Sequence, residues 1–310
     1  MKKKFNFDYD VSAITGYAKE TGFDVLMKEV FAGNTLQYVK IYPDVKGTIK
    51  VPVMDTELVL TDASCGWNST GDTTVTQVTI ETCAKQSKME LCPQDLVDTF
   101  LSESLSRGNW YESVPYEEMI LADVSQKFAK QIELALWNEN KASGGCFNGY
   151  KAQLTAANGA ITGTTSGLTS DNALDIVGEY LQLIPVDVSH RNDLVCWMSY
   201  SNYRTLLNAA RKSSQLNLFS FDAGEATNGM DWKFVFPASN VLCLPTMGIT
   251  DNKMYIGPAN YMLAGVNSVD QTATDLKAFY DESNDVVKIG AKATFGAAVF
   301  AIEDFVAIIA

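Results

Sequence analysis

The chain contains few of the residue types on which catalytic and metal centres depend. Histidine occurs once in 310 residues, at His190 in the polar stretch DVSHRND, and none of the six cysteines belongs to a Cys-x-x-Cys pair. Zinc sites and histidine-based hydrolases need several such residues close together. No glycine-rich phosphate-binding pattern is present either. We therefore expect no metal, no cofactor and no catalytic residue.

Positive charge is also scarce. The chain has 24 Lys and Arg residues against 37 Asp and Glu residues, a net charge of −13, and its only basic run is Lys2-Lys3-Lys4. An acidic surface repels phosphate backbones. Sequence-specific binding of nucleic acid is therefore not expected.

Long hydrophobic runs are missing as well. The most apolar segment, 293–310, carries Glu303 and Asp304 in its middle, so it is too short and too charged to span a membrane. The basic start is followed by FNFDYD rather than by an apolar run, so we expect no signal peptide and folding in a cytoplasm. In that compartment we expect free buried thiols for the cysteines, which stand at 65, 83, 92, 146, 196 and 243.

Two groups of acidic residues could in principle form a site: a calcium loop at 281–285 and a carboxylate pair at Glu303 and Asp304. The segment 281–285 (DESND) has an Asp-x-Ser-x-Asp spacing, but it lacks the glycine and the twelfth-position acid of a calcium loop, and Lys292 stands where that acid would be. A hairpin turn is the better interpretation. Glu303 and Asp304 are adjacent, and neighbours on a strand point to opposite faces, so we expect no shared proton.

Three segments are rich in β-branched and aromatic residues. They are LQYVKIYP (36–43), TIKVPVM (48–54) and TTVTQVTIET (73–82). Turn-forming residues fill 62–72 between the last two. This pattern predicts a long two-stranded excursion with a loop at its tip. Such a ribbon is not stable alone in water, so something else must cover it.

The longest helix is predicted over 115–139, where apolar residues recur at three- and four-residue spacing. It would be roughly 36 Å long. The rest of the chain alternates, with helices at 172–184 and 200–211. Strands are expected at 194–199 and near 233–236, 241–244, 253–256, 276–280 and 286–290, and the terminal apolar run is read as buried strands.

The order of these elements, together with three local patterns, resembles a known family. The patterns are Ile132-Glu133…Trp137-Asn138 with Phe147-Asn148-Gly149 and Leu154; Cys92-Pro93-Gln94-Asp95-Leu96; and Tyr38-Val39…Pro43-Asp44-Val45-Lys46…Val51-Pro52. They are similar to patterns in the HK97-type major capsid proteins of tailed bacteriophages, especially phages that infect Bacteroidetes. Trp137 and Phe147 would anchor the turn after the long helix in the core.

The resemblance implies an α+β HK97-like capsid fold. It assigns 1–35 to an N-terminal arm, 36–85 to an E-loop β-hairpin and 86–171 to a P-domain with a long spine helix. It assigns 172–290 to an A-domain and 291–310 to return strands of the P-domain. The implied function is structural rather than enzymatic. Hexamers and pentamers of the chain would form an icosahedral or prolate shell around phage double-stranded DNA, assembled in the cytoplasm of a host bacterium.

The resemblance also implies partners and contacts. The chain would associate with itself and with a portal, and with separate scaffolding and decoration proteins where these exist; no membrane is involved, and packaged DNA would be near without specific binding. Because few residues precede the first helix, no built-in scaffolding segment is expected. The segment between Val51 and Ala84 has no lysine, so no lysine–asparagine cross-link is expected.

The loop at the tip of the excursion holds the expected intersubunit contacts, Cys65, Trp67 and Asn68. A disulfide through Cys65 after the particle leaves the cell is a further option. Two other functions stay open at this point. One is an encapsulin-type cellular shell, which would have an inner pocket for cargo peptides, and the other is an unrecognised α/β enzyme, which would have a concave pocket with convergent polar groups.

Overall fold

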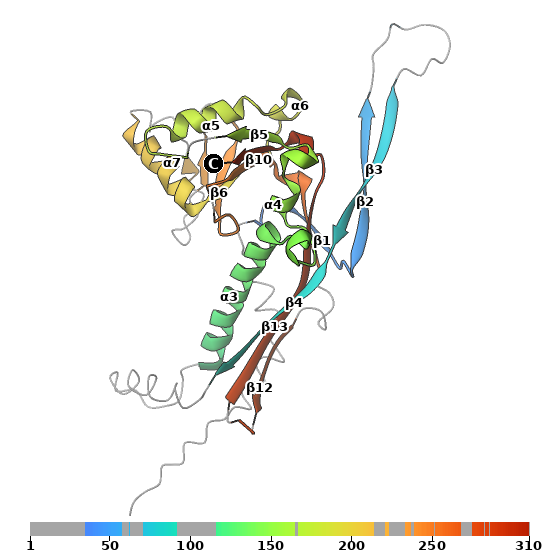
Figure 1. The fold of residues 1–310 in the computed structure, drawn as a ribbon, viewed down its shortest axis with the longest axis vertical. Helices are drawn as coiled ribbons and strands as arrows, with labels where there is room; N and C mark the ends of the chain where they lie inside the picture. The colour runs from blue at the N-terminus through green and yellow to red at the C-terminus, as the bar shows by residue number, and fades with distance from the viewer. Residues whose placement is uncertain are drawn as a thin grey trace, which may run out of the picture.

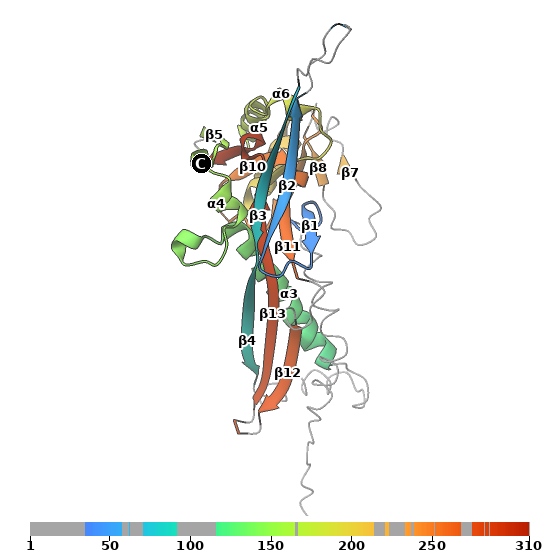
Figure 2. The same ribbon diagram turned by 90° about the vertical axis from the view of Figure 1, so that its right-hand side faces the viewer.

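The computed structural model describes residues 35–57, 62, 71–91, 116–164, 167–213, 221–222, 233–236, 239–250, 252–267, 275–281, 283–284 and 286–309. Its described part has three regions (Figure 1). A rounded α/β region carries the C-terminal end, a long narrow sheet extends away from it beside one helix, and a two-stranded ribbon projects in the opposite direction. Seen from the side, the long sheet and the ribbon lie roughly end to end (Figure 2).

The long sheet is built around one strand, β13. Its five strands are β1 (Lys40–Pro43), β4 (Cys83–Leu91), β11 (Met262–Val266), β12 (Asp275–Asp281) and β13 (Val286–Val299). One edge of β13 pairs with β4, and the other edge pairs first with β12 and then with β11, all antiparallel. β1 adds to β11 in parallel. The β12–β13 hairpin confirms the turn expected at 281–285.

Helix α3 (Tyr116–Asn138) covers one face of the long sheet and confirms the predicted helix to within one residue at each end. Its apolar stripe is buried: Leu121, Val124, Phe128, Ile132 and Leu136. Alternate residues of β13, among them Val287, Ile289 and Ala291, are buried in the same core cluster. The apolar stripe of helix α3 therefore packs against the apolar face of strand β13.

The second sheet has seven strands in the order β5 (Ile161–Thr164), β14 (Val306–Ile309), β10 (Met254–Pro258), β6 (Leu194–Ser199), β9 (Leu242–Thr246), β8 (Lys233–Val235) and β7 (Phe221–Asp222). Helices α5 (Ala173–Leu181) and α7 (Tyr200–Lys212) share a core with one set of alternating strand residues. The other set packs toward the end of α3 and α4 (Tyr150–Gln153). Short helical segments complete the part of the chain that the structure describes: α6 (Val186–Ser189) and 3-10 turns at Lys141–Ser143, Ala156–Asn158, Ala259–Tyr261 and Ile302–Asp304.

Aromatic side chains join the end of α3 to the second sheet. The Trp137 ring centroid lies 5.3 Å from that of Tyr150, 5.9 Å from that of Trp197 and 5.6 Å from that of Tyr255. Trp137 and Phe147 are both fully buried, which confirms their expected role as anchors of the turn after the helix. Because this cluster continues the core under the long sheet, the two sheets share one apolar core.

A buried carboxylate adds a polar tie at the same junction. Oε1 of Glu133, on α3, accepts hydrogen bonds from the hydroxyls of Thr35 at 2.9 Å and Thr246 at 2.7 Å. The indole nitrogen of Trp137 donates to the Thr35 hydroxyl at 2.9 Å. Three segments distant in sequence are therefore held at one point: the start of the described chain, the helix and the end of β9.

Two expectations about side chains were wrong. Cys83 and Cys146 form a disulfide, and Cys146 is exposed, whereas only Cys196 and Cys243 among the described cysteines are free buried thiols. Glu303 and Asp304 lie in a 3-10 turn, not on a strand. Partial burial raises the pKa of Asp304, and the negative charges of Glu303 and Asp187 raise it further.

The two sheets draw on interleaved parts of the chain, and the expected domain ranges stay a prediction. Strands β12 and β13, which begin within the range expected for the A-domain, lie in the long sheet beside α3. The chain passes from the second sheet to the long sheet at the 3-10 turn Ala259–Tyr261, between β10 and β11. Within 291–310, β13 belongs to the long sheet and β14 to the second. The physical reason is strand pairing between distant segments, which sequence order does not reveal.

Candidate assembly surfaces

The ribbon consists of β2 (Thr48–Glu57) and β3 (Asp72–Glu81), which pair antiparallel over ten residues each. Most of β3 is exposed, and burial begins only near its end at Ile80. Met54 and Val75 are cross-strand partners that leave 69% and 59% of their surfaces exposed. A two-stranded ribbon of this kind gains too little burial to be stable without a cover. Its described part is therefore a surface suited to contact another molecule.

At the crossing point at the base of the ribbon, two short links join the ribbon to the long sheet. Residues 44–47 join β1 to β2, and Thr82 alone joins β3, which ends at Glu81, to β4, which begins at Cys83. The Thr82 amide donates to the Gly47 carbonyl at 2.7 Å, and the Gly47 amide donates to the Thr82 hydroxyl at 3.1 Å. Gly47 has a φ of 88°, which favours glycine. These bonds fasten the two strands of the ribbon together where they leave the body.

Two glycines let this crossing lie directly on the long sheet. Gly265 of β11 and Gly296 of β13 are register partners. A Cβ on Gly296 would stand 1.9 Å from the Glu81 carbonyl oxygen, and one on Gly265 would stand 2.8 Å from the Ile80 side chain. Ile80 is fully buried against Leu263 and Ala298. The absence of side chains at these two positions makes room for the ribbon.

The loop that follows α3, residues 139–149, is a bracket around the crossing point. Cys146 of the bracket is joined to Cys83. Lys85 Nζ lies 2.6 Å from Glu139 Oε1, and Lys141 forms an ion pair with Glu81. The bracket thus contacts the chain on both sides of Thr82.

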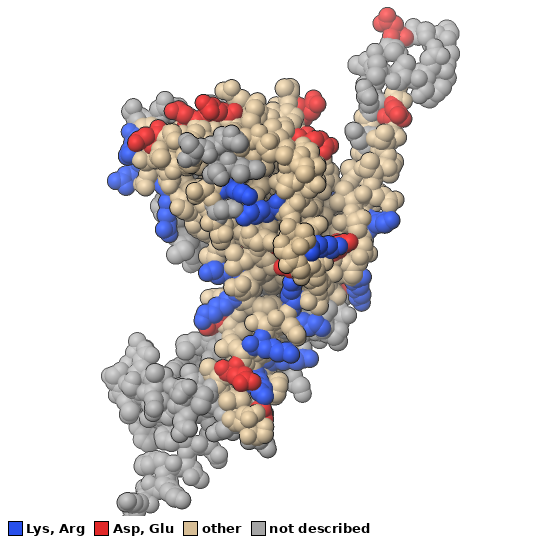
Figure 3. Space-filling view, in the orientation of Figure 1, with Lys and Arg blue, Asp and Glu red and all other residues tan. Residues whose placement is uncertain are grey.

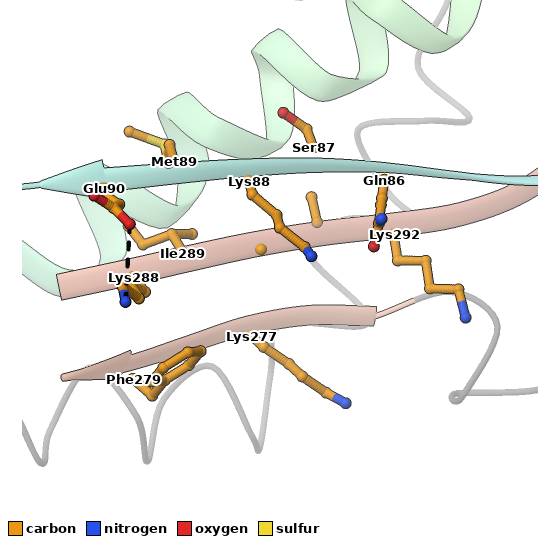
Figure 4. Close-up of a pocket in the computed structure, with 12 residues that line it drawn as sticks. Gln86, Ser87, Lys88, Met89, Glu90, Lys277, Phe279, Lys288, Ile289 and Lys292 are labelled. Carbon is orange, nitrogen blue, oxygen red and sulfur yellow. Dashed lines mark ion pairs between the residues drawn. The ribbon is translucent and has the colours of Figure 1, made fainter. Parts of the chain in front are cut away.

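The face of the long sheet away from α3 is basic. Side chains of Lys88, Lys277 and Lys292 project from β4, β12 and β13 to this side, whereas Met89 and Ser87 point toward α3 (Figure 4). With Lys288 they border a groove of about 540 Å³. Figure 3 shows Lys and Arg along this part of the molecule, with a few Asp and Glu among them, and also on the rounded region, while other Asp and Glu lie at the far end of the rounded region and of the ribbon. We call Lys88, Lys277, Lys288 and Lys292 the lysine face.

Part of the lysine face is neutralised locally. Lys288 Nζ lies 2.5 Å from Asp281 Oδ2 and 3.8 Å from Glu90 Oε1. The Lys288 hydrogen bond, followed by those of Ser283 and Asn284, holds the pKa of Asp281 far below its usual value, and Asp281 in turn raises the pKa of Lys288. By contrast, residues 48–81, which hold the two ribbon strands and the segment between them, carry five acids and one lysine, Lys50. The ribbon segment and the lysine face are therefore opposite in charge.

The described residues contain no group of three or more His, Cys, Asp or Glu side chains placed to hold a metal ion. None of the helices described is long and apolar enough to cross a membrane. His190 is exposed at the end of α6, as a loop histidine would be.

No family model matches the sequence, and no curated protein matches it either. The structure, however, is similar to solved shells. The virus-like particle from Pyrococcus furiosus aligns with a TM-score of 0.55 and 13% identity over 94% of this chain and 98% of that chain. The satellite phage P4 procapsid, whose structure includes the size determination (Sid) protein, aligns at 0.57 and 10% identity over 92% and 98%. The capsid of a native GTA particle aligns at 0.55 and 14% identity over 90% and 89%.

The chain has the α+β HK97-like capsid fold. Proteins with this fold build capsids and shells and are structural rather than enzymatic. The extended architecture agrees with that: a long helix beside a narrow sheet, a projecting ribbon and a compact α/β region (Figure 1). The finer resemblance to capsid proteins of phages that infect Bacteroidetes stays a prediction.

The expected intersubunit residues Cys65, Trp67 and Asn68 lie outside the described residues, between the end of β2 and the start of β3. Their role stays a prediction. Sequence reasoning missed the lysine face, although 286–293 carries its signal. Buried Val287, Ile289 and Ala291 alternate there with Lys288, Gly290 and Lys292, the period-2 pattern of a half-buried strand.

Proposed function

We propose that this chain is the major capsid protein of a tailed bacteriophage. Copies would associate through hexamers and pentamers into an icosahedral or prolate shell that encloses phage double-stranded DNA. The shell would assemble in the host cytoplasm and become the virion capsid. A portal, with separate scaffolding and decoration proteins where these exist, would complete the set of partners.

The observation that carries the proposal is the ribbon. It extends away from the body, exposes the Met54–Val75 pair and lacks a cover within the described part of its own chain. A second copy of the chain can supply that cover. Repetition of the same contact by every subunit around a ring generates closed, symmetric assemblies.

Charge indicates which surface of the neighbouring subunit the ribbon contacts. Residues 48–81, which hold the ribbon strands and the segment between them, have five acids and one lysine, and the lysine face is a basic surface on the long sheet. We expect the ribbon of one subunit to lie over the lysine face of its neighbour. Opposite surface charges speed association and select the register, and salt weakens them.

A cellular shell of the encapsulin type is the second candidate. The likeness to the virus-like particle from Pyrococcus furiosus favours it as much as the phage relatives favour a capsid. Particles isolated from a natural source distinguish the two. Nuclease-protected double-stranded DNA inside the particles supports the capsid, whereas protein cargo without DNA supports the cellular shell.

The proposal is tested by purifying the chain and measuring its mass in solution beside negative-stain electron microscopy. Closed shells, rings or capsomer-sized oligomers are expected. Lys88→Glu, on the lysine face, should weaken association more at low salt than at high salt. Lys130→Glu, which makes the same charge change at an exposed position of helix α3, is the matched control and should leave association unchanged. A chain that stays monomeric under all conditions, crowding agent included, refutes the proposal.

A further inference from the structure

We propose that Cys83 and Cys146 form a redox-controlled latch that fixes the direction of the ribbon relative to the long sheet. The latch concerns the chain itself. It rests on the proposed function only for its consequence in a shell, where the direction of the ribbon decides how far one subunit overlaps its neighbour.

The latch stands at the place where the ribbon pivots. Thr82 alone separates β3, which belongs to the ribbon, from β4, which belongs to the long sheet. A small change in the backbone dihedral angles of Thr82 moves the far end of the ribbon by a large distance, because the ribbon is long. Cys83 is the first residue after that pivot, so a bond to its sulfur acts where rotation begins.

The partner of Cys83 belongs to a firmly anchored segment. The bracket 139–149 lies between α3 and α4, and fully buried Trp137, Phe147 and Tyr150 hold its two ends in the main core. Within it, the Gly149 amide donates to the Glu139 carbonyl at 2.7 Å. A bond from Cys146 therefore ties the pivot to the rigid body of the protein.

Without the disulfide, the bracket holds the pivot only weakly. Its two ion pairs with the chain on either side of Thr82 are partly solvent-exposed. The side chains of Lys85 and Glu139 are 37% and 16% exposed, and those of Lys141 and Glu81 are 45% and 42% exposed. Exposed pairs contribute little and are screened by salt. The Lys141–Glu81 pair is the one that reaches the ribbon side of Thr82. Opening the disulfide thus frees the pivot from the bracket and leaves the ribbon base held by the Gly47–Thr82 hydrogen bonds and by the burial of Ile80.

Solvent access makes the bond switchable. Cys146 is exposed and Cys83 is half-buried, whereas Cys196 and Cys243 are fully buried in another core. The hydrogen bond with Cys196, followed by burial, raises the pKa of Cys243 well above its ordinary value, which disfavours the reactive thiolate. A reagent in solution therefore reaches the first pair and spares the second.

The redox step needs only a small-molecule disulfide or dithiol. On closing, the thiolate of Cys146 attacks oxidised glutathione and displaces one glutathione thiolate. The thiolate of Cys83 then attacks the mixed disulfide and displaces the second. Two electrons pass to glutathione, and the two protons lost by the cysteines end on the released thiols. Dithiothreitol reverses the step and becomes a cyclic disulfide. A reducing compartment keeps the latch open, and an oxidising medium closes it.

Hydrogen exchange of the full-length protein tests the latch. The purified chain is treated with oxidised glutathione or with dithiothreitol, and thiols are counted by alkylation and mass spectrometry. Two more thiols are expected after reduction, and backbone amides of 45–49 and 78–82 should exchange about tenfold faster. Cys146→Ser should exchange like the reduced protein under both treatments, and Cys83→Ser is a second variant with the same expectation. Amides of β6 and β9 are the internal control and should not change.

Two results overturn the latch. In one, the thiol count rises by two while exchange at the ribbon base stays the same. In the other, oxidised glutathione fails to close the bond in the folded chain. Shell formation is measured separately. If hydrogen exchange depends on the redox state but the chain never assembles, the latch is supported and the proposed function is refuted. If shells form but the ribbon base exchanges equally in the oxidised and reduced protein, the latch alone is refuted.

Discussion

Replacing Gly296 by alanine should displace the ribbon from the body. The new Cβ would stand 1.9 Å from the Glu81 carbonyl oxygen, 2.8 Å from the carbonyl carbon and 3.0 Å from the Thr82 Cα. All three atoms are backbone, so no side chain can rotate out of the way. The chain at the pivot must retreat by about 1 Å, because real Cβ contacts almost never fall under 3.0 Å.

The cost of this retreat follows from overpacking. Extra methyl groups in tightly packed sites typically cost about 1–3 kcal/mol. We expect about 2–3 kcal/mol here, since β4 and the Gly47–Thr82 hydrogen bonds must shift together. In a chain of this length that lowers Tm by about 3–5 °C, measured by differential scanning fluorimetry.

Gly290→Ala is the matched control. Gly290 lies on the same strand and the same face, but its added Cβ would meet only the Ser87 carbonyl oxygen at 4.0 Å. Its Tm should change by no more than about 1 °C. Assembly should also fail in Gly296→Ala and persist in Gly290→Ala. Equal stability and equal assembly of the two variants would refute the argument that the ribbon rests directly on Gly296.

Three further predictions concern stability. Cys146→Ser should lower the free energy of unfolding under oxidising conditions by up to about 4 kcal/mol, because the bond closes a sequence separation of 63 residues; equal denaturant midpoints for the variant and the oxidised parent would contradict this. Thr35→Val should cost about 1–3 kcal/mol, since it removes the hydroxyl that bonds Glu133 and Trp137; a chemical denaturation curve that overlays the parent's would show that the tie is dispensable. Asp304→Asn should raise Tm slightly at pH 7, by up to about 1 °C, because the folded protein raises the pKa of Asp304 and so disfavours its charged form. The gain should shrink as the pH falls toward 4, where the parent becomes protonated; a gain that stays constant with pH would rule out this cause.

The helices and strands that the sequence predicts well are those whose local residue pattern is enough to determine them. Helix α3 was placed to within one residue because its apolar stripe repeats with helical spacing. Strand β6 was placed at its observed bounds, as a short buried run bounded by polar segments. The ribbon strands were recognised from their Thr and Val content, with β3 found one residue earlier than expected and β2 three residues longer.

Elements that depend on distant partners were not found. Strand β4 reads CAKQSKMEL, with no β-branched residue, and it is a strand because β13 pairs with it along nine positions. The Cys83–Cys146 bond joins residues 63 positions apart, a proximity that no local pattern records. The place of 275–290 in the long sheet has the same origin. Pairing across the chain decides each of these, so residue type alone does not.

The central claim is that the ribbon of one subunit covers its neighbour in a closed shell. A single-particle electron cryomicroscopy reconstruction of assembled particles tests it most directly. We predict density for β2 and β3 over the lysine face of an adjacent subunit, with Met54 and Val75 buried in the contact. Particles in which every ribbon stays exposed to solvent, or a protein that forms no particles in any buffer, would contradict the account.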